Sequence, residues 1–204
     1  INSRIELGAK SIIRDQSVST FSETYDHDAQ AFSEDTLANF DYRYDERIFS
    51  IYGIFGQQID KFKYQFGVRL EQAYQIPELI SESSSIPNTY FNAFPSAHIK
   101  YALNERNELG LSYSRRISRA RANQLNPFTN YADPFNLRRG NPYLQPEYIH
   151  SFDLAYTFEK KTFSISSSLY YRRSQGVITR IKEFYDDNTS AITYQNLSST
   201  NALG

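Results

Sequence analysis

The sequence predicts an all-β chain, an antiparallel up-and-down meander of about eight strands. Three observations predict it. Several segments alternate strictly between apolar and polar residues, as strands do because successive side chains point to opposite faces of a sheet. The connections between these segments alternate between short and long. Tyrosine and phenylalanine, which favour strands, are frequent, with 17 and 15 copies in 204 residues.

The first half of the chain contains the least regular of these segments. Residues 3–13 alternate and predict the first strand, which residues 14–26 either continue or meet as a hairpin partner. Residues 26–38 are acidic and uneven, so we expect a loop there. Residues 40–58 predict a strand of ambiguous register, because two sets of apolar residues compete for one face.

The clearest strand lies at residues 62–74, after a short turn near 58–61. Its apolar residues fall at every second position, and we expect Phe62, Tyr64, Phe66, Val68 and Leu70 to point outward. Residues 75–94 are serine-rich and flanked by prolines, and they predict a second long loop. Further strands and turns follow in this order: strand 95–103, turn 104–107, strand 108–117, loop 118–146, strand 147–158, turn 159–161, strand 162–173, strand 176–185, turn 186–190 and strand 191–197.

The arrangement of the connections favours a sheet that crosses a membrane. The turns near 58–61, 104–107 and 159–161 are short, whereas the connections near 26–38, 75–94 and 118–146 are long. Short turns at one end and long loops at the other are typical of outer-membrane barrels. Strands of about eleven residues reach across a bilayer when they are tilted. The meander is therefore predicted to be part of a larger transmembrane β-barrel.

The composition excludes several classes of protein. The net charge of −1 gives no basic surface for nucleic acid, and the absence of cysteine excludes a disulfide scaffold. We find no nucleophile elbow, no zinc-protease motif and no phosphate-binding loop, and the histidines His27, His98 and His150 stand on separate segments. The sequence therefore predicts no enzyme, no catalytic residues, no metal site and no cofactor.

The loop at residues 115–147 is the most informative stretch. It holds four of the seven prolines and six arginines against one aspartate, Asp133, and it keeps many apolar side chains. Loops of this length are usually functional or disordered, and the apolar residues favour a loop that packs on another part of the protein.

The motifs of this loop resemble those of one family. SRRI at 114–117, NPF at 126–128 and GNPYLQPE at 140–147 are similar to the strand end and surface loop of TonB-dependent outer-membrane receptors. The resemblance extends more weakly over nearly all 204 residues. It implies one domain over residues 1–204, a partial barrel with the plug domain and remaining strands outside this chain. It also implies a location in the outer membrane of a Gram-negative bacterium.

The same resemblance implies a function and partners. The parent protein would take up a scarce, bulky ligand of the siderophore, cobalamin, glycan or peptide class. Its partners would be outer-membrane lipid, the imported ligand, a surface lipoprotein and the TonB complex, reached through an N-terminal part. Two alternatives stay open: a small self-closed eight-stranded outer-membrane protein with a structural or adhesive role, and a soluble β-sandwich or ligand-binding domain.

The loop also contains the candidate ligand contacts. Guanidinium groups bind carboxylate and phosphate groups, and aromatic rings stack on flat ligands. We therefore expect ligand contacts from the following residues: Arg119, Arg121, Arg138, Arg139, Tyr131, Phe135 and Tyr143. Two other roles for these arginines compete with this hypothesis, namely pairing with anionic surface lipid and pairing with acidic residues of neighbouring loops, such as Glu34 and Asp35.

Overall fold

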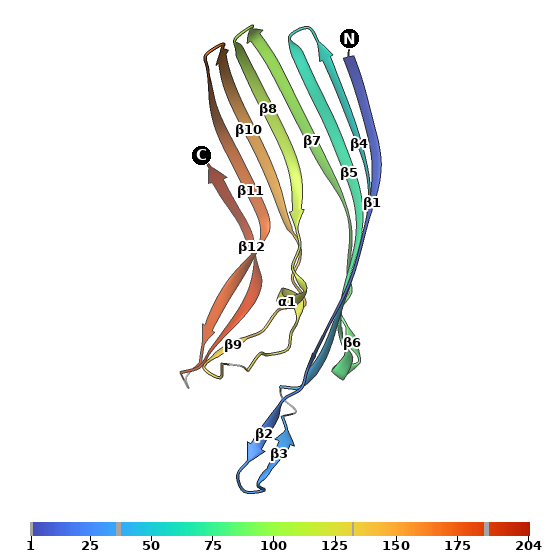
Figure 1. The fold of residues 1–204 in the computed structure, drawn as a ribbon, viewed down its shortest axis with the longest axis vertical. Coiled ribbons are helices and arrows are strands. Elements are labelled where there is room, and N and C mark those ends of the chain that lie inside the picture. Colours follow the sequence, from blue (N-terminus) through green and yellow to red (C-terminus); the bar gives the residue numbers. More distant parts are fainter. Residues whose placement is uncertain (1, 36–37, 132, 186–187) are drawn as a thin grey trace.

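Most of the protein is one curved, mainly antiparallel sheet, and a short hairpin forms a second, two-stranded sheet (Figure 1). The structure, a computed structural model, describes residues 2–35, 38–131, 133–185 and 188–204. Eight long strands follow each other in space in the order in which they occur in the chain, which confirms the predicted meander. They are β1 (Asn2–Thr20), β4 (Phe40–Ile59), β5 (Phe62–Leu79), β7 (Asn88–Asn104), β8 (Asn107–Ser118), β10 (Glu147–Lys160), β11 (Phe163–Phe184) and β12 (Ser190–Leu203).

The smaller elements all lie at one end of the sheet, opposite the tight turns (Figure 1). They are β2 (Glu23–Asp26), β3 (Ala31–Glu34), η1 (Ile80–Glu82), β6 (Ser84–Ser85), α1 (Ala122–Leu125) and β9 (Asn136–Arg138). We call this end the loop end. Within the described residues the sheet is open, because β1 and β12 pair with inner neighbours and not with each other.

Two predicted loops are wrong in their extent. Residues 26–38 include part of a hairpin, since β2 pairs with β3. The loop predicted at residues 75–94 is much shorter, because β5 continues to Leu79 and β7 already begins at Asn88. The prolines suggested a loop, but Pro77 lies within β5 and Pro95 within β7. Proline is tolerated in a strand where its missing N–H has no partner strand to pair with. Pro95 faces β5 on one side only, because pairing of β7 with β8 starts at Ser96.

The two faces of the sheet differ in chemistry. The inner face is the one against which residues 119–146 pack, and it buries Tyr44, Glu46 and Gln75. The opposite face, which we call the outer face, carries Phe49 and Ile51 of β4. Both remain exposed, which settles the ambiguous register of this strand.

An apolar band covers the outer face next to the tight turns. Phe62, Phe66 and Val68 of β5 lie in it and are about half exposed, on the face opposite the buried Glu71 and Ala73. Neighbouring strands contribute exposed Phe55, Ile51, Leu111, Leu154 and Leu169. An exposed apolar surface of this extent marks an interaction with a membrane or another protein.

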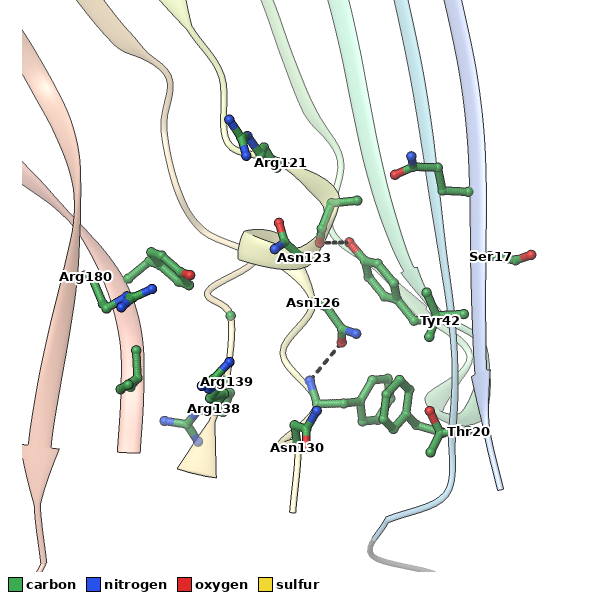
Figure 2. Close-up of a pocket in the computed structure, with 18 residues that line it drawn as sticks. Ser17, Thr20, Tyr42, Arg121, Asn123, Asn126, Asn130, Arg138, Arg139 and Arg180 are labelled. Atoms are coloured by element: carbon green, nitrogen blue, oxygen red, sulfur yellow. Dashed lines mark hydrogen bonds between the residues drawn. The ribbon is translucent and has the colours of Figure 1, made fainter. Parts of the chain in front are cut away.

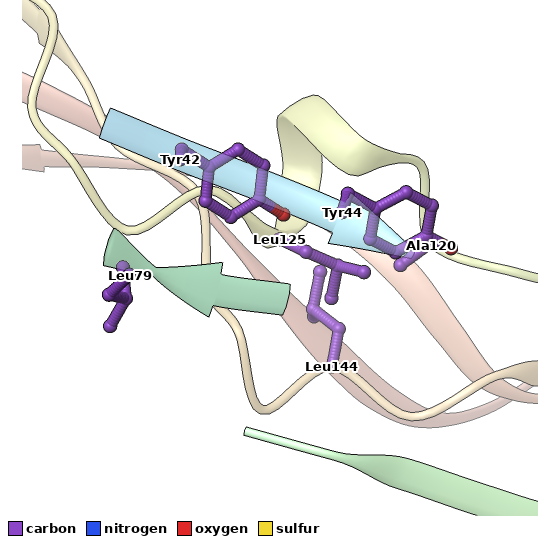
Figure 3. Packing of buried hydrophobic residues seen from close by; sticks show 6 residues of the cluster. All are labelled: Tyr42, Tyr44, Leu79, Ala120, Leu125 and Leu144. Atoms are coloured by element: carbon purple, nitrogen blue, oxygen red, sulfur yellow. The ribbon is translucent and has the colours of Figure 1, made fainter. Parts of the chain in front are cut away.

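The core lies at the loop end, on the inner face (Figure 3). Tyr42 and Tyr44 of β4 and Leu79 of β5 pack against Leu125 of α1 and Leu144 of the loop. Ala120 completes the cluster. The central loop therefore packs on the sheet, as its apolar residues predicted.

The arrangement of the turns and loops makes a prediction about sidedness. Glu105 lies in the turn between β7 and β8, whereas Tyr143 is exposed at the loop end. In intact cells carrying the full-length protein, an impermeant thiol reagent is expected to label Tyr143→Cys and to spare Glu105→Cys, because long loops face the cell exterior. Labelling of the Glu105→Cys variant alone would show the inverted topology.

Candidate functional site

The central loop, residues 119–146, is anchored to the inner face by a buried ion pair at its start. Arg119 Nη2 contacts Glu71 Oε1 of β5, and its Nε donates a hydrogen bond to the hydroxyl of Tyr90 at 2.7 Å. Both atoms of the ion pair are buried, and each is the other's only polar contact among the described residues. Burial lowers the pKa of the Arg119 guanidinium, and the Glu46 carboxylate opposes that shift.

A hydrogen-bond network extends from this anchor across β7, β5, β4 and β1. Tyr90 donates to Gln75 Oε1 at 3.1 Å, and Gln75 Nε2 donates to Glu46 Oε1 at 3.1 Å. Glu46 is paired with Arg14 of β1 at 2.5 Å. Each buried charge therefore has a partner of opposite sign, as the cost of burying an unpaired charge requires.

Two segments of the loop, NPF at 126–128 with the residues before it and GNPYLQPE at 140–147, are joined by backbone hydrogen bonds. Gly140 N donates to Asn126 O at 2.8 Å, and Asn141 N donates to Gln124 O at 2.7 Å. Gly140 has no space for a side chain, since a Cβ there would lie 2.5 Å from the carbonyl oxygens of both Asn126 and Gln124. The glycine is therefore required by the close approach of NPF to GNPYLQPE.

This close approach makes a prediction about the glycine. Gly140→Ala is expected to destabilise the loop by about 1–3 kcal/mol, because a methyl group must displace two backbone carbonyls. Gly110→Ala is the control, since a Cβ there meets nothing closer than 3.8 Å. Limited proteolysis of the full-length protein should cleave the loop faster in the Gly140 variant only. Equal cleavage of both variants would contradict the packing.

The end of the loop is held by asparagines. Asn141 Nδ2 donates to Tyr194 O at 3.0 Å, and Asn88 Nδ2 donates to Leu144 O at 3.3 Å. Asn196 Nδ2 donates to Gln145 O at 2.8 Å, and Asn196 Oδ1 accepts a hydrogen bond from Gln145 N at 2.9 Å. The loop thus joins β7 to β12 across the inner face.

In the middle of the loop, β9 adds to the free edge of β12. The pairing is parallel, with Asn136 opposite Ser190 and Arg138 opposite Ile192. The turn before β9 is held by Asp133, and hydrogen bonds from the Asn136 side chain and the Phe135 backbone lower the pKa of its carboxyl. The turn keeps this contribution at neutral pH and loses it only as the pH falls through the lowered pKa.

A cavity of about 990 Å³ lies between this loop, the ends of β1 and β4, and the ends of β11 and β12 (Figure 2). The aromatic part of its wall includes Phe40 stacked on Phe128 at 4.5 Å, and Tyr42, whose hydroxyl donates to Ala122 O at 3.2 Å. Polar side chains complete the wall: Gln16, Ser17, Thr20, Asn123, Asn126, Asn130, Arg121, Arg138, Arg139 and Arg180.

The electrostatics of this cavity are one-sided. Four arginines line it, and its described lining contains no aspartate or glutamate. Within the described residues, none of the four forms a salt bridge, and all four are exposed. Guanidinium groups that form no salt bridge attract anions when they lie in a concave site. The arrangement can therefore bind a ligand that carries carboxylate, phosphate or other negative groups.

The structure brings together only part of the predicted contact set. Arg121, Arg138 and Arg139 line the cavity, whereas Arg119 is turned into the inner face against Glu71. Tyr143 lines a second cavity of about 470 Å³ beside Arg139. Tyr131 and Phe135 are exposed at the loop end, outside the described lining of both cavities.

Sequence reasoning missed the contributions of the strands. Arg180 of β11 lies in the cavity wall although it is 41 residues beyond Arg139 in the chain. Gln16, Ser17 and Thr20 enter from β1. Arg180 is opposite Tyr194 of β12, another residue of the cavity wall. The alternation of residues along the strand was the only sequence signal for the face on which Arg180 lies.

Other candidate chemistry is not supported. Within the described part of the chain, no group of three His, Asp or Glu side chains could hold a metal ion. Asp26 closes a turn by accepting hydrogen bonds from the N–H groups of Asp28 and Ala29 at 2.8 and 3.1 Å. Across the same described residues, no helix is long and apolar enough to span a membrane.

Comparison with protein families gives a match over the whole chain. The model of the outer membrane protein beta-barrel family matches residues 1–204. No curated protein sequence matches the chain.

Solved structures share the fold at low sequence identity. The hemophore receptor HasR of Serratia marcescens, solved with HasA and heme, is 11% identical with a TM-score of 0.64, over 99% of this chain and 39% of HasR. The copper transporter OprC is 12% identical with a TM-score of 0.65, over 100% and 32% of the two chains. The ferric-catecholate import receptor Fiu of E. coli K12 is 11% identical with a TM-score of 0.60, over 99% and 32%. The chain thus spans about a third of the length of these proteins.

Proposed function

Because this chain belongs to the outer membrane protein beta-barrel family and lies in the outer membrane of a Gram-negative bacterium, we propose that it forms part of a TonB-dependent transporter. The transporter takes up a scarce, bulky ligand through the barrel. The apolar outer face contacts lipid, and the polar inner face lines the path of the ligand.

The basic cavity at the loop end carries the proposal about the ligand. Its volume of about 990 Å³ suits a bulky molecule, and its arginines favour an anionic one. Arg121, Arg138 and Arg139 come from a loop that is anchored at both ends, so they are held in place before the ligand arrives. Such preorganisation lowers the cost of binding.

The fold by itself does not name the cargo. HasR binds a hemophore and heme, OprC transports copper, and Fiu imports ferric catecholates. Among the siderophore, cobalamin, glycan and peptide classes, the cavity therefore favours anionic members of any class over neutral ones. In this proposal Arg119 anchors the loop through Glu71 and so positions the contact residues, without contacting the ligand itself.

The proposal also assigns the parts that this chain does not supply. Residues 1–204 act as one partial-barrel domain, and the remaining strands and a plug domain belong to the rest of the transporter. The length of the receptors with the same fold, of which the chain spans 32–39%, supports this division. The TonB complex delivers energy through the plug-bearing part, and a surface lipoprotein is a further partner.

Uptake by cells tests the transport function. Cells carrying the full-length protein are expected to accumulate an anionic ligand only when the TonB complex is present, because release from a tight site requires energy. Uptake that continues unchanged without TonB would identify a passive pore instead.

Replacement of the cavity arginines tests the site. The triple variant Arg121→Gln, Arg138→Gln and Arg139→Gln is expected to weaken ligand binding at least about tenfold, since each hydrogen bond to a charged group contributes roughly 1.5–3 kcal/mol. Gln replacements at Arg43 and Arg47 are the control, because both guanidiniums lie on the outer face. Unchanged binding by the triple variant would leave transport in place and remove these arginines from it.

A further inference from the structure

The sheet divides between β7 and β8 at the loop end (Figure 1). The two strands pair with each other only as far as Ser96 and Ser114. Beyond these residues β7 continues to pair with β5, and β8 continues to pair with β10. Among the described residues, no backbone–backbone hydrogen bond joins 88–95 to 115–118. The division lies beside the point where the central loop begins.

A proline stands at the point of division. Arg115 Nη1 donates to Ala93 O at 3.0 Å, so the carbonyl of Ala93 points to the β8 side of β7. In an antiparallel ladder, residues two apart present their N–H and C=O groups to the same edge. The backbone of Pro95 therefore also faces β8, where it has no N–H to donate. A ladder that continued in register would place Pro95 opposite Arg115 and leave the Arg115 carbonyl without its donor.

The end of the ladder changes the face on which two arginines lie. Alternation along β8 would place Arg115 and Arg119 on the outer face with Tyr113. Both guanidiniums lie against inner-face residues instead. Arg115 lies 5.9 Å from the ring centroid of the buried Phe94, and Arg119 contacts Glu71 of β5.

A continued ladder would separate Arg119 from its partner. Its register would place Arg119 opposite Phe91, which is 63% exposed on the outer face. Glu71 lies on the inner face, opposite Asn92. The buried ion pair that anchors the central loop therefore requires the ladder to end before Arg119.

Side chains replace the missing ladder. Arg115 Nη2 donates to Asn92 Oδ1 at 3.4 Å, and the Arg115 guanidinium lies over the Tyr148 ring at 4.8 Å. Asn92 Nδ2 donates to the hydroxyl of Tyr148 at 2.8 Å. These contacts join β7 to β8 and β10 without fixing a backbone register, so the chain after Ser118 can turn toward the inner face.

We propose that Pro95 is a positioning residue for the basic cavity. By ending the β7–β8 ladder it turns Arg115 and Arg119 inward, and the central loop then follows the inner face and brings Arg121 into the cavity wall. This inference rests on the proposed function for the use of the cavity, but the position of the loop is measured without ligand and without transport.

A disulfide reports whether the ladder continues. Residues 1–204 contain no cysteine. Cysteines at Ala93 and Ile117 would be opposite each other only in a continued ladder, whereas Ala97 and Tyr113 are already opposite each other. In full-length protein in lipid vesicles, Pro95→Ala is expected to increase the oxidised fraction of Ala93→Cys with Ile117→Cys roughly tenfold, because it supplies the missing donor of the continued ladder. The pair Ala97→Cys with Tyr113→Cys should oxidise equally with and without Pro95.

The fold of the loop gives a second readout. The amides of Gly140 and Asn141 hold two segments of the loop together, and their hydrogen exchange should be faster in Pro95→Ala, because the loop loses its first anchor. Pro95→Ala combined with Ala93→Pro moves the proline two residues along the same edge and keeps the carbonyl that accepts from Arg115. This double variant should restore slow exchange, which a general loss of stability would not predict.

Pro87→Ala is the matched control, because Pro87 is exposed and precedes β7. It should change neither readout. Pro95→Gly, which also restores the N–H, carries the test if Pro95→Ala does not fold. Equal oxidation of Ala93→Cys with Ile117→Cys in the presence and absence of Pro95, an equal increase in Pro87→Ala, or continued fast exchange with Ala93→Pro would each overturn the proposal. Uptake that continues without TonB would overturn the transport function and leave these results unchanged.

Discussion

Glu71→Ala is expected to lower the free energy of unfolding by about 3–5 kcal/mol, because it removes one partner of a buried ion pair. The side chains of Glu71 and Arg119 are only 7% and 16% exposed, so water cannot replace the lost carboxylate. Arg69 Nε also lies 3.4 Å from Glu71, so two guanidiniums lose their counter-charge. The loop that forms the basic cavity would lose its first anchor.

A double-mutant cycle separates the ion pair from general packing. The loss of stability in the double variant Arg119→Met and Glu71→Leu is expected to be considerably smaller than the sum of the losses in the two single variants. Replacing the buried pair by apolar groups leaves no buried unpaired charge, and the Arg69 guanidinium is 44% exposed and stays hydrated. The measurement is urea unfolding of the full-length protein in lipid vesicles. Additive losses would show that the two side chains do not interact. Glu71→Gln provides a matched control of shape.

The same variants connect stability to the proposed site. Arg121 follows the anchor by two residues, and its guanidinium lines the cavity. In Glu71→Ala protein that still inserts into the membrane, ligand binding should weaken although no cavity residue has changed. The loss should be smaller in the Arg119→Met and Glu71→Leu double variant. Such a pattern would show that the ion pair positions the contact residues and does not itself contact the ligand.

The alternation of residues predicted the sheet because it reports a local property. Each side of a strand meets one environment, so the faces of β5 could be assigned from residues 62–70 without any knowledge of the neighbours. Loop lengths likewise predicted that the tight turns share one end. The strand order followed, since short turns join adjacent antiparallel strands.

The ends of the strands were not predictable in this way. At the loop end, β5 continues through Pro77 to Leu79 because the loop packs on it there, not because of its own propensity. Tertiary packing overrides local preference in such places. The burial of Arg119 against the sheet could not be predicted for the same reason. Its partner Glu71 is 48 residues away in the chain, and no local pattern joins them.

The outer face provides the second large effect. Val68→Arg is expected to lower the free energy of unfolding by about 2–4 kcal/mol, if its position is near the middle of the bilayer, because the charged group must enter hydrocarbon or distort the membrane. Val68 lies on the outer face beside Leu7, Ile51 and Leu70, all of apolar character. Gln65→Arg is the matched control on the inner face of the same strand.

The comparison of the two variants decides which face meets lipid. Gln65 is opposite Gly56 and His98, in a polar part of the inner face that also contains Lys63 and Lys100, so another arginine there should change stability little. Both variants add one positive charge to β5 within three residues of each other. Folding into vesicles should therefore fail or weaken for Val68→Arg alone. Equal tolerance of both would show that the apolar band does not meet lipid, because hydrocarbon penalises a charge at Val68 and not at Gln65.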